Sequence, residues 1–153
     1  FSHFEILLAA TYQGVGERTV EVAAEHVARR RSMKNQTTYS NDPDIRWRIA
    51  EAALIMNAVG PQIRELARDI DAGVDRGRSW MPQLSAAKNA AAEATLRAVE
   101  QAMRACGGSA YYNTHELSRL YRDALAGLFQ PSDQESLHAA WANLILGPIE
   151  KPQ

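Results

Sequence analysis

A narrow stripe of small residues runs through residues 82–105 and restricts the fold more than any other feature of the sequence. Its members recur at steps of three and four residues: Leu84, Ala87, Ala91, Ala94, Ala98 and Ala102. This spacing describes one face of an α-helix, and alanine has the highest helix propensity. Because small side chains let helix axes approach closely, the stripe predicts a helix packed tightly against other helices.

Two further segments have the same periodicity. One face of residues 4–31 carries Leu8, Tyr12, Val15, Thr19, Val22 and His26, and one face of residues 43–70 carries Ile45, Ile49, Ala52, Met56, Val59, Ile63, Leu66 and Ile70. Asp42 followed by Pro43 is a strong start signal for the second helix. Pro61 within it predicts a kink, and a break into two helices is the alternative.

Two shorter helices are predicted towards the C-terminus. Asn113 followed by Glu116 has the spacing of a helix start, which predicts a helix over residues 114–129. Ser132 with Glu135 has the pattern of a capping box for a fifth helix. Long amphipathic helices with short connections indicate an all-α fold, an antiparallel four-helix bundle with an extra short C-terminal helix.

Charge and composition argue against several classes of function. The 17 basic and 18 acidic residues give a net charge of -1, so no overall field attracts nucleic acid. No apolar run approaches the ~20 residues that span a bilayer. The four histidines are scattered and the single cysteine, Cys106, has no partner, so no metal site is predicted. We expect one helical domain over residues 1–153, located in the reducing cytoplasm.

Residues 107–109, the glycine elbow, are the segment that suggests chemistry. Gly107 and Gly108 end one helix and leave backbone amides bare, because glycine has no Cβ to screen them. Such amides suit a phosphate group. A purely structural helix end is the alternative for the two glycines. For Arg122 and Asp123, which follow on the next helix, the alternative is an intramolecular ion pair.

The segments RACGGSAYY (residues 104–112) and LSRLYRDA (residues 117–124) resemble the C-terminal helical domain of the acyl-CoA dehydrogenase superfamily. Members of that family show a Gly-Gly turn and then an Arg-Asp helix in this order. Residues 9–31, rich in small side chains and ending in arginine, are similar to the family's opening helix. The resemblance implies a C-terminal fragment of a larger flavoenzyme, with FAD held between domains and subunits of a homodimer or homotetramer.

The resemblance also implies the residues of a cofactor site. Arg31 matches the arginine that reaches the FAD phosphates, and Gly107 and Gly108 match the turn whose backbone approaches the cofactor of a neighbouring subunit. Ser109 and Arg122 complete the expected cofactor-binding set. All five positions carry groups suited to a diphosphate, since guanidinium groups, hydroxyls and free amides donate hydrogen bonds to anionic oxygens.

The residues after Arg122 and Asp123 decide which branch of the family this chain resembles. Many dehydrogenases carry a glutamate base at the position of Pro131, and proline cannot take a proton. The surrounding sequence looks more like the flavin-dependent monooxygenase branch, which hydroxylates aromatic or sulfur-containing substrates with reduced flavin and O2. That branch commonly has a histidine at the position of Gln130, and glutamine is not a general base near neutral pH.

Gln130 and His138 are therefore the candidate catalytic residues, His138 being the group that could supply the missing base. Two alternatives stay open for the function. One is a true acyl-CoA dehydrogenase whose catalytic base lies at another position and whose partners are flavin and an acyl-CoA substrate. The other is a non-catalytic helical interaction module that kept the fold and lost the cofactor.

Overall fold

The computed structural model describes residues 2–150, which form helices, turns and one isolated β-bridge between Arg31 and Thr38. Within this range the α-helices are α1 (Ser2–Arg29), α2 (Pro43–Asp71), α3 (Trp80–Cys106), α4 (Glu116–Leu125) and α5 (Gln134–Leu146). Short 3-10 helices connect them: η1 (Tyr39–Asn41), η2 (Gly77–Ser79), η3 (Gly107–Tyr111) and η4 (Ala126–Leu128).

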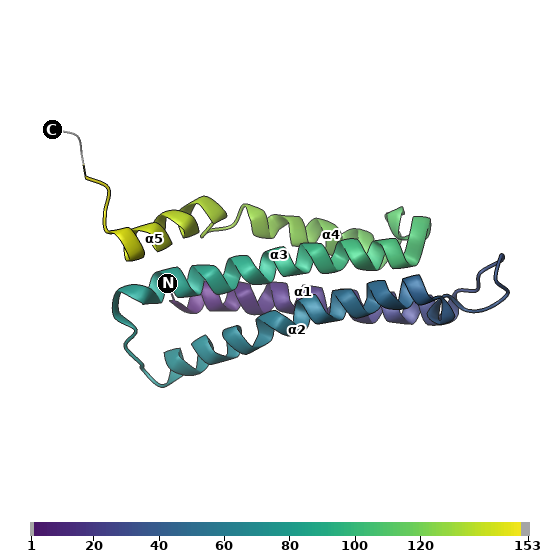
Figure 1. Cartoon of the computed structure of the whole chain (residues 1–153), viewed down its shortest axis with the longest axis horizontal. Helices are drawn as coiled ribbons and strands as arrows, with labels where there is room; N and C mark the ends of the chain where they lie inside the picture. The colour runs from purple at the N-terminus through teal and green to yellow at the C-terminus, as the bar shows by residue number, and fades with distance from the viewer. Residues whose placement is uncertain (1, 151–153) are drawn as a thin grey trace.

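The helices run alternately up and down the length of the molecule (Figure 1). α1, α2 and α3 lie side by side, and α4 and α5 follow one another along α3 as the chain returns. α3 contacts α1, α2, α4 and α5, so it lies at the centre of the bundle. The predicted all-α antiparallel bundle with a short extra C-terminal helix is confirmed.

The alanine stripe of α3 forms the middle of the core. All six predicted positions, from Leu84 to Ala102, are buried. They pack against apolar side chains of α1 and α2: the first three against a group that includes Ile6 and Leu66, the next two against Met56, and the last against Val27. Alanine at these positions allows the three long helices to come close together, which is the physical reason that the stripe predicted the fold.

Gly16 marks the closest approach of α1 to its neighbours. A Cβ on Gly16 would overlap the Met56 side chain of α2 and lie 2.9 Å from Thr95 Oγ1 of α3. Gly14, one half-turn away on the same helix, has no atom within 4 Å of the corresponding position. A helix-weakening glycine at position 16 is therefore explained by packing inside the bundle.

The start of α2 is as predicted, since Asp42 Oδ1 accepts hydrogen bonds from the backbone N–H groups of Asp44 and Ile45. Pro61 lies inside one continuous helix, so the alternative of two separate helices is wrong. Proline has no N–H for the carbonyl of Asn57, four residues earlier. Figure 1 shows the second half of α2 running away from the line of the first half.

Two predicted helix starts are wrong by one or two residues. The N-cap of α4 is His115, whose Nδ1 accepts from Leu117 N, and not Asn113. The N-cap of α5 is Asp133, which accepts from Ser136 N, and not Ser132. Ser132 is engaged elsewhere, because its N–H and carbonyl are hydrogen-bonded to buried side chains of α1 and α3.

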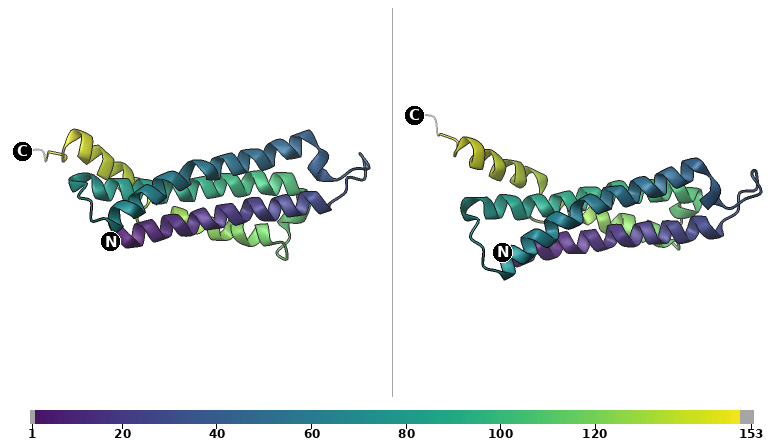
Figure 2. Two further views of the ribbon diagram at one scale, coloured as in Figure 1. Left: turned by 90° about the horizontal axis from the view of Figure 1, so that it is seen from below. Right: turned by 60° about the horizontal axis from the view of Figure 1, so that its bottom comes forward.

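α4 and α5 are attached to the bundle to different degrees. Arg18 of α1 pairs with both carboxylate oxygens of Glu116, at 3.0 Å each, and so fixes the first turn of α4. α5 contains no buried residue, and Figure 2 shows it leaving the body of the bundle. The predicted helix over residues 114–129 is thus a firmly packed α4, completed by η4.

Candidate cofactor site at the glycine elbow

The glycine elbow lies where α3 ends. Cys106 is the last residue of α3, and Gly107 follows with φ +72° and ψ -162°, a conformation that favours glycine. The N–H of Gly107 still bonds to the carbonyl of Met103, so the helix is closed by its C-cap residue. Helix termination is therefore one reason for glycine at position 107.

Gly108 has a different local environment. Its φ lies outside the left-handed region, and a Cβ at this position would find no atom within 4 Å. Neither backbone strain nor packing within residues 2–150 requires a glycine there. The same is true of Gly14, so the described contacts leave these two glycines unexplained.

Arg30, the residue after α1, connects the first helix to the elbow. Its Nη1 donates to the carbonyl of Cys106 at 3.1 Å and to Ser109 Oγ at 2.7 Å. Its guanidinium carbon lies 5.0 Å from the centre of the Tyr39 ring, a cation–π contact. Arg31, the arginine that the sequence singled out, is exposed and donates from Nη2 to the carbonyl of Gln36 in the following loop, at 2.8 Å.

A chain of hydrogen bonds, the histidine relay, links α4 to the elbow. Because His115 Nδ1 accepts from Leu117 N, its proton sits on Nε2, which donates to His26 Nδ1 at 3.3 Å. His26 Nε2 then donates to Ser109 Oγ at 3.2 Å, and Ser109 Oγ donates to the carbonyl of Cys106, also at 3.2 Å. Each atom has a consistent role only when both imidazoles are neutral.

The surroundings of the histidine relay favour that neutral state. Burial lowers the pKa of His26, and the neighbouring His115 and the Arg30 guanidinium lower it further. Burial also raises the pKa of the Cys106 thiol to about 11, which keeps the sulfur protonated. The interior side of the elbow is thus a network of neutral groups and one arginine.

Two hollows flank the elbow. One, of about 400 Å³, is lined by Val22, Glu25, His26, Arg29, Arg30, Thr114, His115 and Glu116. The other, of about 370 Å³, is lined by Met103, Tyr111, Tyr112, Asn113, Ser118, Tyr121 and Arg122. Tyr111 and Tyr112 are largely exposed at 81% and 66%, so this side presents aromatic surface beside the Arg122 guanidinium.

Arg122 is held by its own helix, donating from Nη1 to Ser118 Oγ at 3.0 Å. Asp123 pairs with Arg119 at 3.1 Å instead of with Arg122. The interpretation of Arg122 and Asp123 as an intramolecular pair is therefore wrong. These two charges point to different partners although they are adjacent in the sequence.

The candidate catalytic residues lie away from the elbow, beyond the far end of α4 (Figure 1). The 10 residues of α4 and the 3 of η4 separate them by about 20 Å along the helix axis. Gln130 Oε1 accepts from Tyr12 Oη at 2.5 Å. His138 is exposed on α5, with Nδ1 2.7 Å from the carbonyl of Gln134. The fold therefore does not bring Gln130 or His138 to the elbow.

Sequence reasoning missed a group that we name the buried anchor, formed by Glu5, Lys88 and Asn89. The Lys88 side chain is fully buried, and its Nζ donates to the carbonyls of Gly127, Gln130 and Ser132 at 2.8, 2.7 and 3.1 Å. Asn89 Nδ2 donates to the Ser132 carbonyl at 2.9 Å. Glu5, also fully buried, accepts from Ser132 N at 3.0 Å.

The sequence did contain a signal for the buried anchor. Lys88 lies four residues after Leu84 and Glu5 four residues before Ala9, so both charges occupy apolar faces of their helices. Charged residues are almost never fully buried without partners. A charge on an apolar face therefore indicates an internal partner, although the sequence does not say which one.

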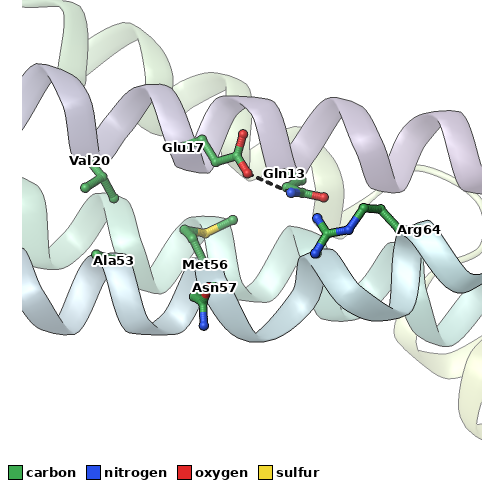
Figure 3. A pocket seen from close by; sticks show the side chains of 8 residues that line it. Gln13, Glu17, Val20, Ala53, Met56, Asn57 and Arg64 are labelled. Atoms are coloured by element: carbon green, nitrogen blue, oxygen red, sulfur yellow. Dashed lines mark hydrogen bonds between the residues drawn. The ribbon is translucent and has the colours of Figure 1, made fainter.

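Another hollow, of about 260 Å³, lies between α1 and α2 (Figure 3). Gln13 Nε2 donates to Glu17 Oε1 at 2.7 Å on its α1 side, and the Arg64 side chain reaches across from α2. Gly60 makes this possible, since a Cβ there would lie 2.8 Å from Arg64 Nη1. None of the predicted site residues lines this hollow. Within residues 2–150 no cluster of three or more His, Cys, Asp or Glu side chains is arranged to hold a metal ion.

The fold closely matches those of several solved structures. A Geobacillus kaustophilus acyl-CoA dehydrogenase superposes with a TM-score of 0.83 at 20% identity, over 95% of this chain and 37% of that one. A glutaryl-coenzyme A dehydrogenase in complex with glutaryl-CoA superposes at 0.81 with 21% identity, over 96% and 36%. Nitroalkane oxidase superposes at 0.85 with 12% identity, over 95% and 34%.

Sequence comparison agrees. The Bacillus subtilis (strain 168) protein YdbM, described as an acyl-CoA dehydrogenase, is 28% identical over 124 residues, which are 81% of this chain and 32% of YdbM. The chain thus spans about a third of the length of these relatives. The profile of the family "Acyl-CoA dehydrogenase, C-terminal domain" matches residues 1–129. The resemblance carried by the glycine elbow and the first helix is confirmed, and this chain belongs to the acyl-CoA dehydrogenase C-terminal domain family.

Proposed function

We propose that this chain is the helical C-terminal part of an FAD-dependent oxidoreductase and that the glycine elbow contacts the flavin diphosphate. The observation that carries the proposal is the open space at Gly108. Because nothing within residues 2–150 requires a glycine there, we explain its small size by another molecule lying against the backbone. A diphosphate is suitable, since it accepts hydrogen bonds from backbone amides.

The other residues around the elbow fit an anionic ligand. Arg30 and Arg122 lie on its two sides, one in each hollow, and Arg31 follows on the loop. Guanidinium groups make the strongest charge-assisted bonds to phosphate oxygens. Arg30 also fixes Ser109, so its part is to hold the elbow in shape while the open backbone at Gly108 receives the ligand.

FAD, when bound, supplies the electron-transfer chemistry, and this chain supplies binding and orientation. Residues 126–133, which we name the α4–α5 connection, then carry the groups nearest to the reaction. Pro131 offers no proton acceptor, and Gln130 can only donate or accept a hydrogen bond. These two residues favour the monooxygenase branch, where reduced flavin and O2 hydroxylate the substrate, over removal of an α-proton.

A true acyl-CoA dehydrogenase is the second candidate, because YdbM is described as one. In that case the base comes from another position, and neither Gln130 nor His138 supplies it. His138 is exposed on α5, and its Nδ1 is engaged with the carbonyl of Gln134. The substrate-facing residues then belong mainly to the two thirds of a full-length relative that this chain does not span.

Assembly into a dimer or tetramer in the cytoplasm completes the proposal. Its support is the apolar surface at the C-terminal end, where Phe129, Ile145, Leu146 and Ile149 are 73–92% exposed. Large apolar side chains that gather on a protein surface usually mark a contact with another protein or domain. Within residues 2–150 no helix combines the length and apolarity needed to cross a lipid bilayer.

The test uses the complete gene product and the variant Gly108→Val. We expect flavin affinity to fall at least tenfold while the melting temperature changes little, because a Cβ at position 108 has no atom of residues 2–150 within 4 Å. Gly107→Val is the matched variant, and we expect it to lower stability as well, because of its positive φ.

Equal losses of flavin affinity and stability in Gly108→Val would support a purely structural elbow. Absence of flavin from the wild-type product would support the non-catalytic module. If flavin is present, bleaching by acyl-CoA identifies a dehydrogenase, and O2-dependent hydroxylation identifies a monooxygenase.

A further inference from the structure

The buried anchor acts on one short stretch of backbone. Lys88 Nζ has three N–H donors, and all three are directed at carbonyls of the α4–α5 connection: those of Gly127, Gln130 and Ser132. Glu5 accepts the N–H of Ser132, and Asn89 donates to its carbonyl. Both backbone polar groups of Ser132 are therefore fixed from inside the bundle.

Fully buried lysine and glutamate side chains such as Lys88 and Glu5 are unusual in a protein core. Burying an ammonium and a carboxylate is costly, and an apolar pair of similar size is often equally or more stable. Glu5 Oε2 is buried without a hydrogen-bond partner, so the charges are not optimised for stability. What the anchor does supply is geometry, because three carbonyls can converge on one nitrogen in few backbone conformations.

The residue whose position is defined in this way is Gln130. Its carbonyl is held by Lys88, and its side chain is held by the hydroxyl of Tyr12. Pro131, at the position of the family's glutamate base, lies between two residues whose carbonyls both bond to Lys88. The buried anchor therefore sets the backbone on both sides of the candidate catalytic position.

We propose that Lys88 and Glu5 are positioning residues that place Gln130 and residue 131 for the reaction. This inference rests on the proposed function, since it assumes that the α4–α5 connection faces the flavin and substrate. Lys88 and Glu5 themselves are buried and touch neither. They act through the backbone, so the chemistry at position 130 depends on two charges in the helical core.

The test compares Lys88→Met with Val99→Ala in the complete gene product. Met keeps the length of the side chain and removes all three donors. Val99 is also fully buried on α3, about 16 Å from Lys88 along the helix, so its truncation weakens the core without touching the connection. Amide hydrogen exchange of residues 126–133, flavin content and steady-state turnover are measured for both.

We expect Lys88→Met to speed exchange in residues 126–133 at least tenfold and to lower kcat at least tenfold, with flavin content and KM within about twofold of wild type. Val99→Ala should leave exchange in this segment and kcat within about twofold. Glu5→Gln is the milder variant, should Lys88→Met not fold, and is expected to show the same changes at about threefold.

Unchanged exchange in residues 126–133 in Lys88→Met, or in Glu5→Gln where Lys88→Met does not fold, would overturn the anchor itself. If residues 126–133 exchange faster in Lys88→Met but kcat is unchanged, the proposal that Lys88 positions Gln130 for the reaction is overturned. Equal kcat losses in Lys88→Met and Val99→Ala would show a general effect of stability and would also overturn it. A wild-type product without flavin or turnover would instead defeat the proposed function, and the exchange data would still decide whether the anchor fixes the backbone.

Discussion

The glycine elbow and the α4–α5 connection are both turns held by side chains that are distant in the sequence, yet the two sets of side chains differ in their burial. At the elbow the holding groups are Arg30 and the histidine relay, which are half-buried and line an open hollow. At the α4–α5 connection the holding groups are Lys88 and Glu5, which are fully buried. At the elbow, water can replace a hydrogen bond that a substitution removes, whereas at the α4–α5 connection it cannot. The same kind of substitution should therefore destabilise the fold more at the α4–α5 connection than at the elbow.

The sharpest test of this difference is the stability of Lys88→Met. The substitution leaves three buried carbonyls without their donor and removes the positive charge near the buried Glu5 carboxyl group. Losing the donor of buried acceptors and one of two buried charges costs about 3–5 kcal/mol, so we expect the free energy of unfolding in urea to fall by that amount. A loss below about 1 kcal/mol would mean that water reaches the three carbonyls of the α4–α5 connection. The two regions would then not differ in their access to solvent.

Arg30→Met is the corresponding change at the elbow. It removes the hydrogen bonds to the Cys106 carbonyl and to Ser109 Oγ, but both acceptors also receive or share a bond within the relay. We expect a loss of about 1–2 kcal/mol in the same urea experiment. Arg31→Met is the matched control with an expected change below about 0.5 kcal/mol, because Arg31 is exposed. A loss as large as that of Lys88→Met would contradict the comparison.

The smallest expected effect is the pH dependence of the elbow. The pKa of His26 is lowered in the folded state, by burial first and then by His115 and Arg30. Between the folded pKa and the unfolded value of 6.5, the unfolded chain binds more protons. The contribution of His26 to stability is therefore complete above pH 6.5 and is lost as the pH falls through the folded pKa.

The measurement is the free energy of unfolding from pH 7.5 to pH 5 for the wild type and for His26→Gln. We expect the wild type to lose more stability on acidification. Glu5 titrates in both proteins with the opposite sign, since burial raises its pKa, and the difference between the two curves removes its contribution. Parallel curves would show that protonation of His26 is not coupled to folding.

The same contrast explains what the sequence could predict. The alanine stripe and the Asp42 cap are local patterns, and both are where they were expected. The helix starts at Asn113 and Ser132 were misplaced because polar residues cluster before α4 and α5, and spacing alone does not choose between them. Ser132 was unavailable as a cap because its carbonyl, which would have to accept the first intrahelical hydrogen bond, already accepts from Lys88 and Asn89.

The candidate site was predicted in part. The glycines of the elbow were visible in the sequence, but only φ and the surrounding space distinguish Gly107 from Gly108. Among the three arginines after His26 the sequence could not tell which one reaches the elbow, since that depends on how far α1 extends. The buried anchor depends on backbone carbonyls 39 to 44 residues away from Lys88, and carbonyls carry no sequence signature.

The contact between Gly16 and Met56 has a consequence for how the helices align lengthwise. Helix faces lined with alanine have few protrusions that fix how far one helix is shifted along another. The Met56 side chain fills the space left by the absent Cβ of Gly16 and so fixes this shift. A shift of one helical turn, about 5.4 Å, would bring Met56 towards Tyr12 or Val20, and neither leaves the same recess. The Met56 sulfur thus fixes the lengthwise position of α2 relative to α1. It thereby also fixes the position of residues 30–42, which connect these two helices.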